Sequence, residues 1–144
     1  MESADLTATA SMTLLLAFEL GERVWKLGFT TGMDQRPRVR QIPAGAVDRV
    51  VDEIARAKRR LQLAPDTLVV SCYEAGRNGF WLHRWLRAQG ITNHVVDSSS
   101  IEVNRRARRA KTDRLDLAWL LILLARYRLG DRRVWRVVPR AERC

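Results

Sequence analysis

The stretch that decides the fold is TLVVSCYEAG, which runs from Thr67 to Gly76. Its first seven residues form a near-continuous apolar run, a pattern typical of a central strand covered on both faces of a sheet. Glu74 follows this run, and the Ala75-Gly76 break after it lets a side chain project from the carboxyl edge of the sheet. Open α/β sheets place their ligands at this edge. A loop charge without chemistry is the alternative interpretation of Glu74.

Strand and helix patterns surround this segment on both sides. Short β-prone runs separated by turn residues predict strands, and apolar residues at helical spacing predict helices. The expected strands are 13–20, 24–30, 38–42, 67–73 and 93–96, and the expected helices are 46–61, 79–89 and about 113–129. The order β-β-β-α-β-α-β-α predicts an α/β fold with a mixed sheet and helices on its faces.

Length and charge restrict the function further. The 144 residues fit one domain, and 26 Lys and Arg against 16 Asp and Glu give a net charge of +10. Such a chain attracts polyanions, with nucleic acid first and an anionic membrane surface second. The longest apolar run, 117–125, has nine residues, whereas a membrane helix needs about 20, so no membrane partner is expected. Cys72 and Cys144 match neither a disulfide framework nor a metal site, which indicates a reducing, cytoplasmic compartment.

Four acidic residues stand where packing does not require an acid. They are Glu19, Glu74, Asp113 and Asp116. The element order brings the first strand, the end of the fourth strand and the start of the last helix to one edge. Asp113 and Asp116, three residues apart at that helix start, are expected on one helix face. Alone, an N-cap role for Asp113 and a helix-dipole role for Asp116 explain these two residues without chemistry.

Carboxylates gathered in this way repel one another unless cations neutralise them. Mg²⁺, or Mn²⁺ in its place, accepts oxygen ligands, and paired ions clamp the attacking and leaving oxygens of phosphoryl transfer. The sequence therefore predicts metal-dependent phosphodiester cleavage. Neither His83 nor His94 has zinc-site spacing; His83 is expected at the surface, and neither receives a role. The tryptophans are expected in the core, with base stacking left open for Trp81 only.

A basic run lies directly before the paired aspartates, from Asn104 to Arg114. It carries six basic residues and one acid. These cations are Arg105, Arg106, Arg108, Arg109, Lys111 and Arg114. The five cations from Arg105 to Lys111 have no acidic residue between them and repel one another, and a phosphate backbone would relieve this repulsion. Nucleic-acid contact is therefore predicted here, with a solvated helix face as the alternative.

Two segments resemble the N-terminal domain of the DEDD-type insertion-sequence transposases, a RuvC-like RNase H fold. They are YEAGRNGFWLHRWL (Tyr73–Leu86) and VDSSSIEVNRRARRAKTDRLD (Val96–Asp116). The resemblance covers roughly 13–138 and implies that the four acids named above bind Mg²⁺, with Glu19 standing where the family usually has Asp. Some members are guided by a bridge RNA. The resemblance thus implies DNA and a structured guide RNA as partners, a nucleoid-associated location, and a homo-oligomer for the full-length protein.

The resemblance also implies a missing half. Full members continue into a helical segment and a C-terminal domain whose serine links covalently to DNA, whereas this sequence ends at Cys144. We expect a transposase fragment, inactive alone, with 1–12 as a flexible leader and 139–144 as an aberrant tail. The alternatives are a non-catalytic DNA- or RNA-binding remnant and, ranked last, a stand-alone junction nuclease.

Overall fold

The computed structural model describes residues 12–32, 35–76, 80–101 and 116–138, and the structural statements below concern these residues. The expected leader, apart from Met12, the basic run and the expected tail lie outside them. In chain order the elements are β1 (Leu14–Leu20), β2 (Val24–Thr30), β3 (Arg38–Pro43), α2 (Val47–Arg60), β4 (Val69–Glu74), α3 (Trp81–Ala88), β5 (Thr92–Asp97), the 3₁₀ turn η1 (Ser98–Ser100), α5 (Leu117–Arg128) and β6 (Arg136–Val137).

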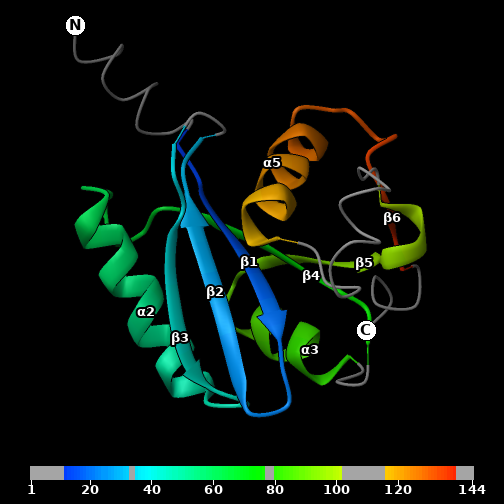
Figure 1. Cartoon of the computed structure of the whole chain (residues 1–144). Coiled ribbons are helices and arrows are strands. Elements are labelled where there is room, and N and C mark those ends of the chain that lie inside the picture. The colour runs from blue at the N-terminus through cyan, green and yellow to red at the C-terminus, as the bar shows by residue number, and fades with distance from the viewer. Residues whose placement is uncertain (1–11, 33–34, 77–79, 102–115, 139–144) are drawn as a thin grey trace, which may run out of the picture.

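In the described part of the chain, six strands form one mixed sheet in the order β3-β2-β1-β4-β5-β6 (Figure 1). β2 pairs antiparallel with both β1 and β3, whereas β4 pairs parallel with both β1 and β5. The predicted α/β class, with a mixed sheet that carries helices, is confirmed. The sequence patterns miss β6, a short strand that pairs antiparallel with β5.

Alternate residues of the central strands face two different apolar clusters. In β1, Leu14, Leu16 and Phe18 belong to the cluster with α2 and α3, while Leu15 and Ala17 belong to the cluster with α5. Helices therefore cover both faces of the sheet, with α2 and α3 on one side and α5 on the other (Figure 1). This double covering explains why the central strands read as apolar runs without polar alternation.

Helix α5 approaches the sheet closely because β2 has a glycine beneath it. A Cβ placed on Gly28 would lie 3.2 Å from Leu121 Cδ1 and 3.4 Å from Leu117 Cβ. Val134 and Trp135 belong to the same apolar cluster as α5, so the helix also has apolar neighbours beyond the sheet. Within the described ranges, no helix is both long and apolar enough to cross a membrane.

His83 is buried, so the prediction that it lies at the surface is wrong. Its side chain on α3 is 1% exposed and belongs to a chain of hydrogen bonds that crosses two strands. Ser71 Oγ donates to Asn93 Oδ1 at 2.7 Å, and Asn93 Nδ2 lies 3.0 Å from His83 Nδ1. Asn93 thus supplies a polar partner inside the core for Nδ1 of the buried imidazole.

The tryptophans pack largely as predicted. Trp25 and Trp135 are fully buried, and the predicted core role is confirmed for both. Trp81 is 38% exposed, and its ring stacks on Trp25 with the centroids 6.0 Å apart. One face of the Trp81 ring is therefore already occupied by a core residue.

We expect Gly28→Val to lower the free energy of unfolding by about 1–3 kcal/mol, because the added carbons push α5 away from β2. Gly32→Ala is the matched control, since a Cβ on Gly32 meets no atom within 4 Å. Urea unfolding followed by circular dichroism measures both variants. Equal stability of the two variants would contradict the close approach of α5.

Candidate functional site

The carboxyl ends of the parallel strands bring three acidic residues to one edge of the sheet. Glu74 is the last residue of β4, Asp97 is the last residue of β5, and Glu19 is the next to last of β1. Because β1, β4 and β5 run in the same direction, these three positions lie at the same edge. The edge is the one at which the sequence predicts the site.

Glu19 and Glu74 also share the face of the sheet that α5 covers. Ala17 pairs with Cys72 in the β1–β4 register, and both belong to the apolar cluster of α5. Because side chains alternate along a strand, Glu19 and Glu74, each two residues further on, lie on the same face as Ala17 and Cys72. Both glutamates are half-buried. The α5 face therefore changes from apolar to acidic at the carboxyl edge on two adjacent strands.

The environment of Cys72 agrees with this placement. Burial raises the pKa of the Cys72 thiol, and the charge of Glu74 raises it further. The thiol is therefore protonated at neutral pH and serves as a small packing group beneath the acidic edge. It does not have the lowered pKa of a nucleophilic cysteine.

Asp116 caps the helix that covers this face. Its Oδ1 accepts a hydrogen bond of 2.9 Å from the Ala118 N–H, and its own backbone is extended. The prediction of a helix from about Asp113 with Asp116 inside its first turn is wrong at this point, because α5 begins at Leu117. Leu117 lies against Gly28, which pairs with Ala17, so α5 begins close to the half of β1 that leads to Glu19.

The described residues supply only part of the predicted acidic site. Asp113 and all six basic residues of the run before α5 lie outside the described ranges. Among the described residues, no group of three or more His, Cys, Asp or Glu side chains is placed to hold a metal ion. For the predicted site, the structure thus shows that Glu19 and Glu74 lie on the same face at the same edge of the sheet. Lys26 stands opposite Glu19 in the β1–β2 register.

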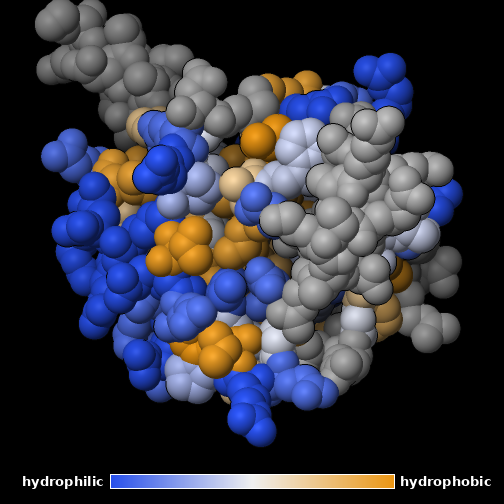
Figure 2. Space-filling model, viewed as in Figure 1, coloured by the Kyte–Doolittle hydropathy of each residue, from blue (hydrophilic) through white to orange (hydrophobic). Residues whose placement is uncertain are grey.

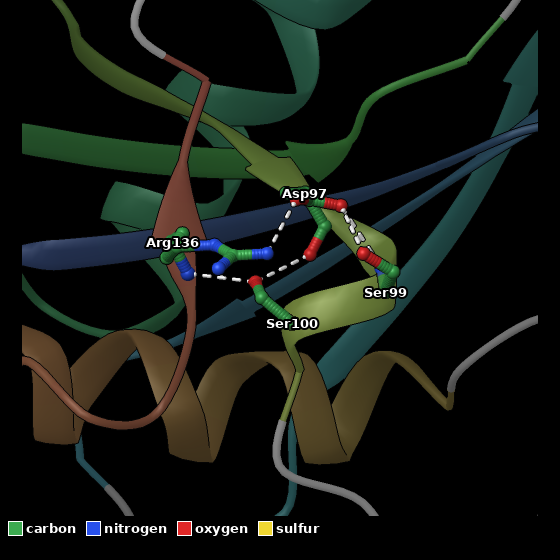
Figure 3. Close-up of polar contacts among 4 residues, drawn as sticks. All are labelled: Asp97, Ser99, Ser100 and Arg136. Carbon is green, nitrogen blue, oxygen red and sulfur yellow. Dashed lines mark hydrogen bonds and ion pairs between the residues drawn. The ribbon is translucent and has the colours of Figure 1, made fainter.

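Asp97 is a polar centre at the same edge that the sequence patterns do not identify (Figure 3). Its Oδ1 accepts hydrogen bonds from Ser99 Oγ at 2.8 Å and from the Ser99 N–H at 3.1 Å. Arg136 Nη2 lies 3.2 Å from Asp97 Oδ2, and the Arg136 N–H donates to Ser100 Oγ at 2.7 Å. These contacts fasten β6 to the end of β5.

The same contacts set the charge of Asp97. The hydrogen bonds from the Ser99 side chain and backbone, followed by the one from Arg136, hold the pKa of Asp97 below its ordinary value. Asp97 is therefore ionised at neutral pH, and its carboxylate oxygens are bound by Ser99 and Arg136. Two sequence signals could have found this cluster: an aspartate followed by three serines is typical of a capped turn, and VWRVV (134–138) is β-prone.

Comparison with known proteins gives one close match. The chain is 43% identical over 91 residues to the protein named "Putative transposase y4rJ" of Sinorhizobium fredii (strain NBRC 101917 / NGR234). The match covers 63% of this chain and 22% of that relative, so the matched part is about a fifth of the relative's length. No protein-family model matches the chain.

We expect Asp97→Asn to weaken the acid sensitivity of the fold. Because the pKa of Asp97 is lower in the folded chain, the unfolded chain binds more protons at acid pH. The stabilisation is complete above the ordinary aspartate pKa of about 3.9 and is lost as pH falls through the lowered folded value. The Tm of the variant should therefore fall less steeply than that of the parent between about pH 5 and pH 2.

Thermal unfolding at a series of pH values measures this slope. Arg128→Gln is the control, because it removes an exposed arginine of α5 that has no contact with Asp97 among the interactions described above. The control should keep the slope of the parent. A parental slope in Asp97→Asn would contradict the assigned role of the Ser99 and Arg136 contacts.

Proposed function

We propose that this chain is the N-terminal, RuvC-like domain of a DEDD-type insertion-sequence transposase, which binds nucleic acid and holds Mg²⁺ at the carboxyl edge of its sheet. In this proposal the full protein cleaves and exchanges DNA strands during transposition. The chain alone supplies the metal-binding and backbone-binding half of that machinery. Its partners are DNA and a structured guide RNA, and it is located at the nucleoid.

The relative supports the transposase part of this proposal. A protein named as a transposase shares 43% of residues with this chain over 91 positions. Since the chain matches only 22% of that relative, strand exchange is proposed for a longer protein in which this domain takes part. A net charge of +10 supports nucleic acid as the partner.

The metal-binding part of the proposal rests on one observation. Glu19 and Glu74 end the same face of two adjacent parallel strands, at the edge where α/β sheets bind ligands. The residues two places earlier on that face, Ala17 and Cys72, are buried in the apolar cluster, so the two acids begin where the apolar packing ends. Side by side, two carboxylates destabilise each other unless a cation lies nearby.

The donor set fits a hard divalent cation. Carboxylate oxygens are the ligands that Mg²⁺ and Mn²⁺ prefer, and Mg²⁺ often uses only one or two carboxylates besides water and substrate phosphates. Glu19, Glu74, Asp116 and Asp113 would hold the ion in the proposal. When bound, the metal supplies electrostatic stabilisation to the attacking and leaving oxygens of phosphoryl transfer. The protein's own part is to fix the glutamates on two rigid strands and to exclude water beneath them with α5.

We expect Mg²⁺ or Mn²⁺ to raise the Tm of the chain by about 5–10 °C at roughly a hundred times the dissociation constant. Glu74→Gln should abolish the rise, because it removes a carboxylate while keeping the shape of the side chain. Glu19→Gln should reduce or abolish it for the same reason. Asp66→Asn is the matched control, since this exposed aspartate precedes β4 and lies at the opposite end of that strand. Differential scanning fluorimetry with each ion measures all four proteins.

The outcomes separate the proposal from its main alternative. A metal-dependent rise that Asp66→Asn retains and Glu74→Gln loses supports the acidic site. Absence of any rise in the parent chain would overturn it. If salt-sensitive binding to DNA or RNA then persists in EDTA and in the glutamate variants, the chain is a non-catalytic nucleic-acid-binding remnant.

A further inference from the structure

A second charged feature lies on the opposite face of the sheet, between β3 and α2. Five arginines line a hollow of about 330 Å³ there. They are Arg38, Arg40, Arg56, Arg59 and Arg60. Arg38 and Arg40 share the face of β3 with Ile42, which belongs to the cluster that α2 covers. Figure 2 shows hydrophilic residues gathered along the side of the molecule that α2 and β3 form.

One buried carboxylate holds part of this arginine cluster together. Glu53 of α2 is 3% exposed, and its carboxylate lies 3.4 Å from Arg40 Nε, 3.9 Å from Arg38 Nη2 and 4.0 Å from Arg56 Nη1. These ion pairs connect β3 to α2 and explain why arginines stand on an edge strand. Arg59 and Arg60 are not among the partners of Glu53.

The cluster carries more positive charge than Glu53 can neutralise. Five guanidinium groups and one carboxylate leave a charge of 5 − 1 = +4 around the hollow. Burial, together with the neighbouring charges of Arg40 and Arg60, lowers the pKa of Arg38 despite Glu53. Arg38 Nε is buried and has no hydrogen-bond acceptor among the described residues. Glu53 Oε1 is likewise buried without a hydrogen-bond donor among the described residues, and the net positive charge of the cluster is what an anion would neutralise.

A structural role alone does not account for the whole cluster. Basic residues in the last turn of a helix interact favourably with its dipole, and this effect favours Arg59 and Arg60 where they stand. The Glu53 ion pairs account for Arg38 and Arg40 on β3, but neither they nor the dipole neutralise the remaining positive charge of the cluster.

We propose that this hollow binds a phosphate group of a nucleic-acid backbone. Guanidinium groups bind phosphate oxygens through paired N–H donors, and they keep their charge at all physiological pH values. Nucleic acid as the source of the phosphate rests on the function proposed above and on the net charge of +10. Because the sheet separates this hollow from Glu19 and Glu74, the phosphate bound here anchors the strand and is not the one that is cleaved.

The test compares two double variants of the full chain. Arg59→Gln with Arg60→Gln removes two positive charges from one wall of the hollow and leaves the Glu53 ion pairs in place. Arg84→Gln with Arg128→Gln removes the same charge from exposed positions on α3 and α5 that do not line the hollow. Fluorescence anisotropy with a labelled DNA duplex and a labelled RNA hairpin, in EDTA and over a range of salt concentrations, measures binding. Thermal unfolding verifies that each variant folds.

We expect the hollow variant to lose about tenfold in affinity and its salt dependence to become shallower by about one to two in log–log slope. The control should stay within about twofold of the parent chain. Equal losses in the two double variants would overturn the proposal, because only net charge would then matter. Comparison of the DNA and RNA arms identifies which backbone the hollow prefers.

A measurement on the unmodified chain avoids dependence on how the variants fold. The Nε–Hε resonance of Arg38 in a ¹⁵N-labelled sample should shift when a short DNA duplex or RNA hairpin is added. A shift with inorganic phosphate but with neither nucleic acid would overturn the nucleic-acid assignment, as would no shift with any of them. Because both experiments omit divalent metal, their result is independent of the Glu74→Gln test, and failure of one does not imply failure of the other.

Discussion

The parallel pairing of β1 with β4 is the constraint on which the rest of this structure depends. β1 is the strand at which the sheet changes from antiparallel to parallel, because β2 flanks it on one side and β4 on the other. The register of Ala17 with Cys72 assigns every second residue of both strands to the α5 face. A slip by one residue would turn one glutamate toward the α2 and α3 cluster, so a single register decides whether Glu19 and Glu74 can act together.

Two charged clusters of opposite net sign lie on opposite faces of the sheet. On the α5 face the apolar cluster ends at two glutamates, whereas on the α2 face arginines from β3 and α2 surround Glu53. Two apolar clusters and the sheet itself lie between them. This separation keeps the arginines from neutralising the acidic pair directly. In the proposed function, one face holds the metal for strand cleavage while the other holds a backbone phosphate at a distance from it.

Most of the elements could be predicted from the sequence because their signals are local. The apolar run before Glu74, the turn at Gly21 and the helical spacing over 46–61 each show one element without knowledge of the rest. The wrong predictions concern features that depend on tertiary contacts between elements. His83 is buried because Asn93, on a different element, supplies its polar partner. The sequence patterns do not reveal the arginine hollow either, because Arg38 and Arg60 line the same hollow only when β3 packs beside α2.

The candidate site could likewise be predicted only in part from the sequence. Its edge could be predicted, since parallel strands end together and acids there stand out from apolar neighbours. The start of the last helix could not, because the spacing of Asp113 and Asp116 fits a helix turn as well as the N-cap that Asp116 forms. The ion pair of Asp97 depends on Arg136, which reaches it because β6 pairs with β5.

Paramagnetic broadening of amide signals by Mn²⁺ locates the ion in solution without any substitution. Small additions of Mn²⁺ should broaden the backbone amides around Glu19 and Glu74 first, while those of α2 and β3 stay sharp. Broadening centred elsewhere, or spread evenly over the exposed carboxylates, would contradict the assignment of this edge of the sheet as a metal site.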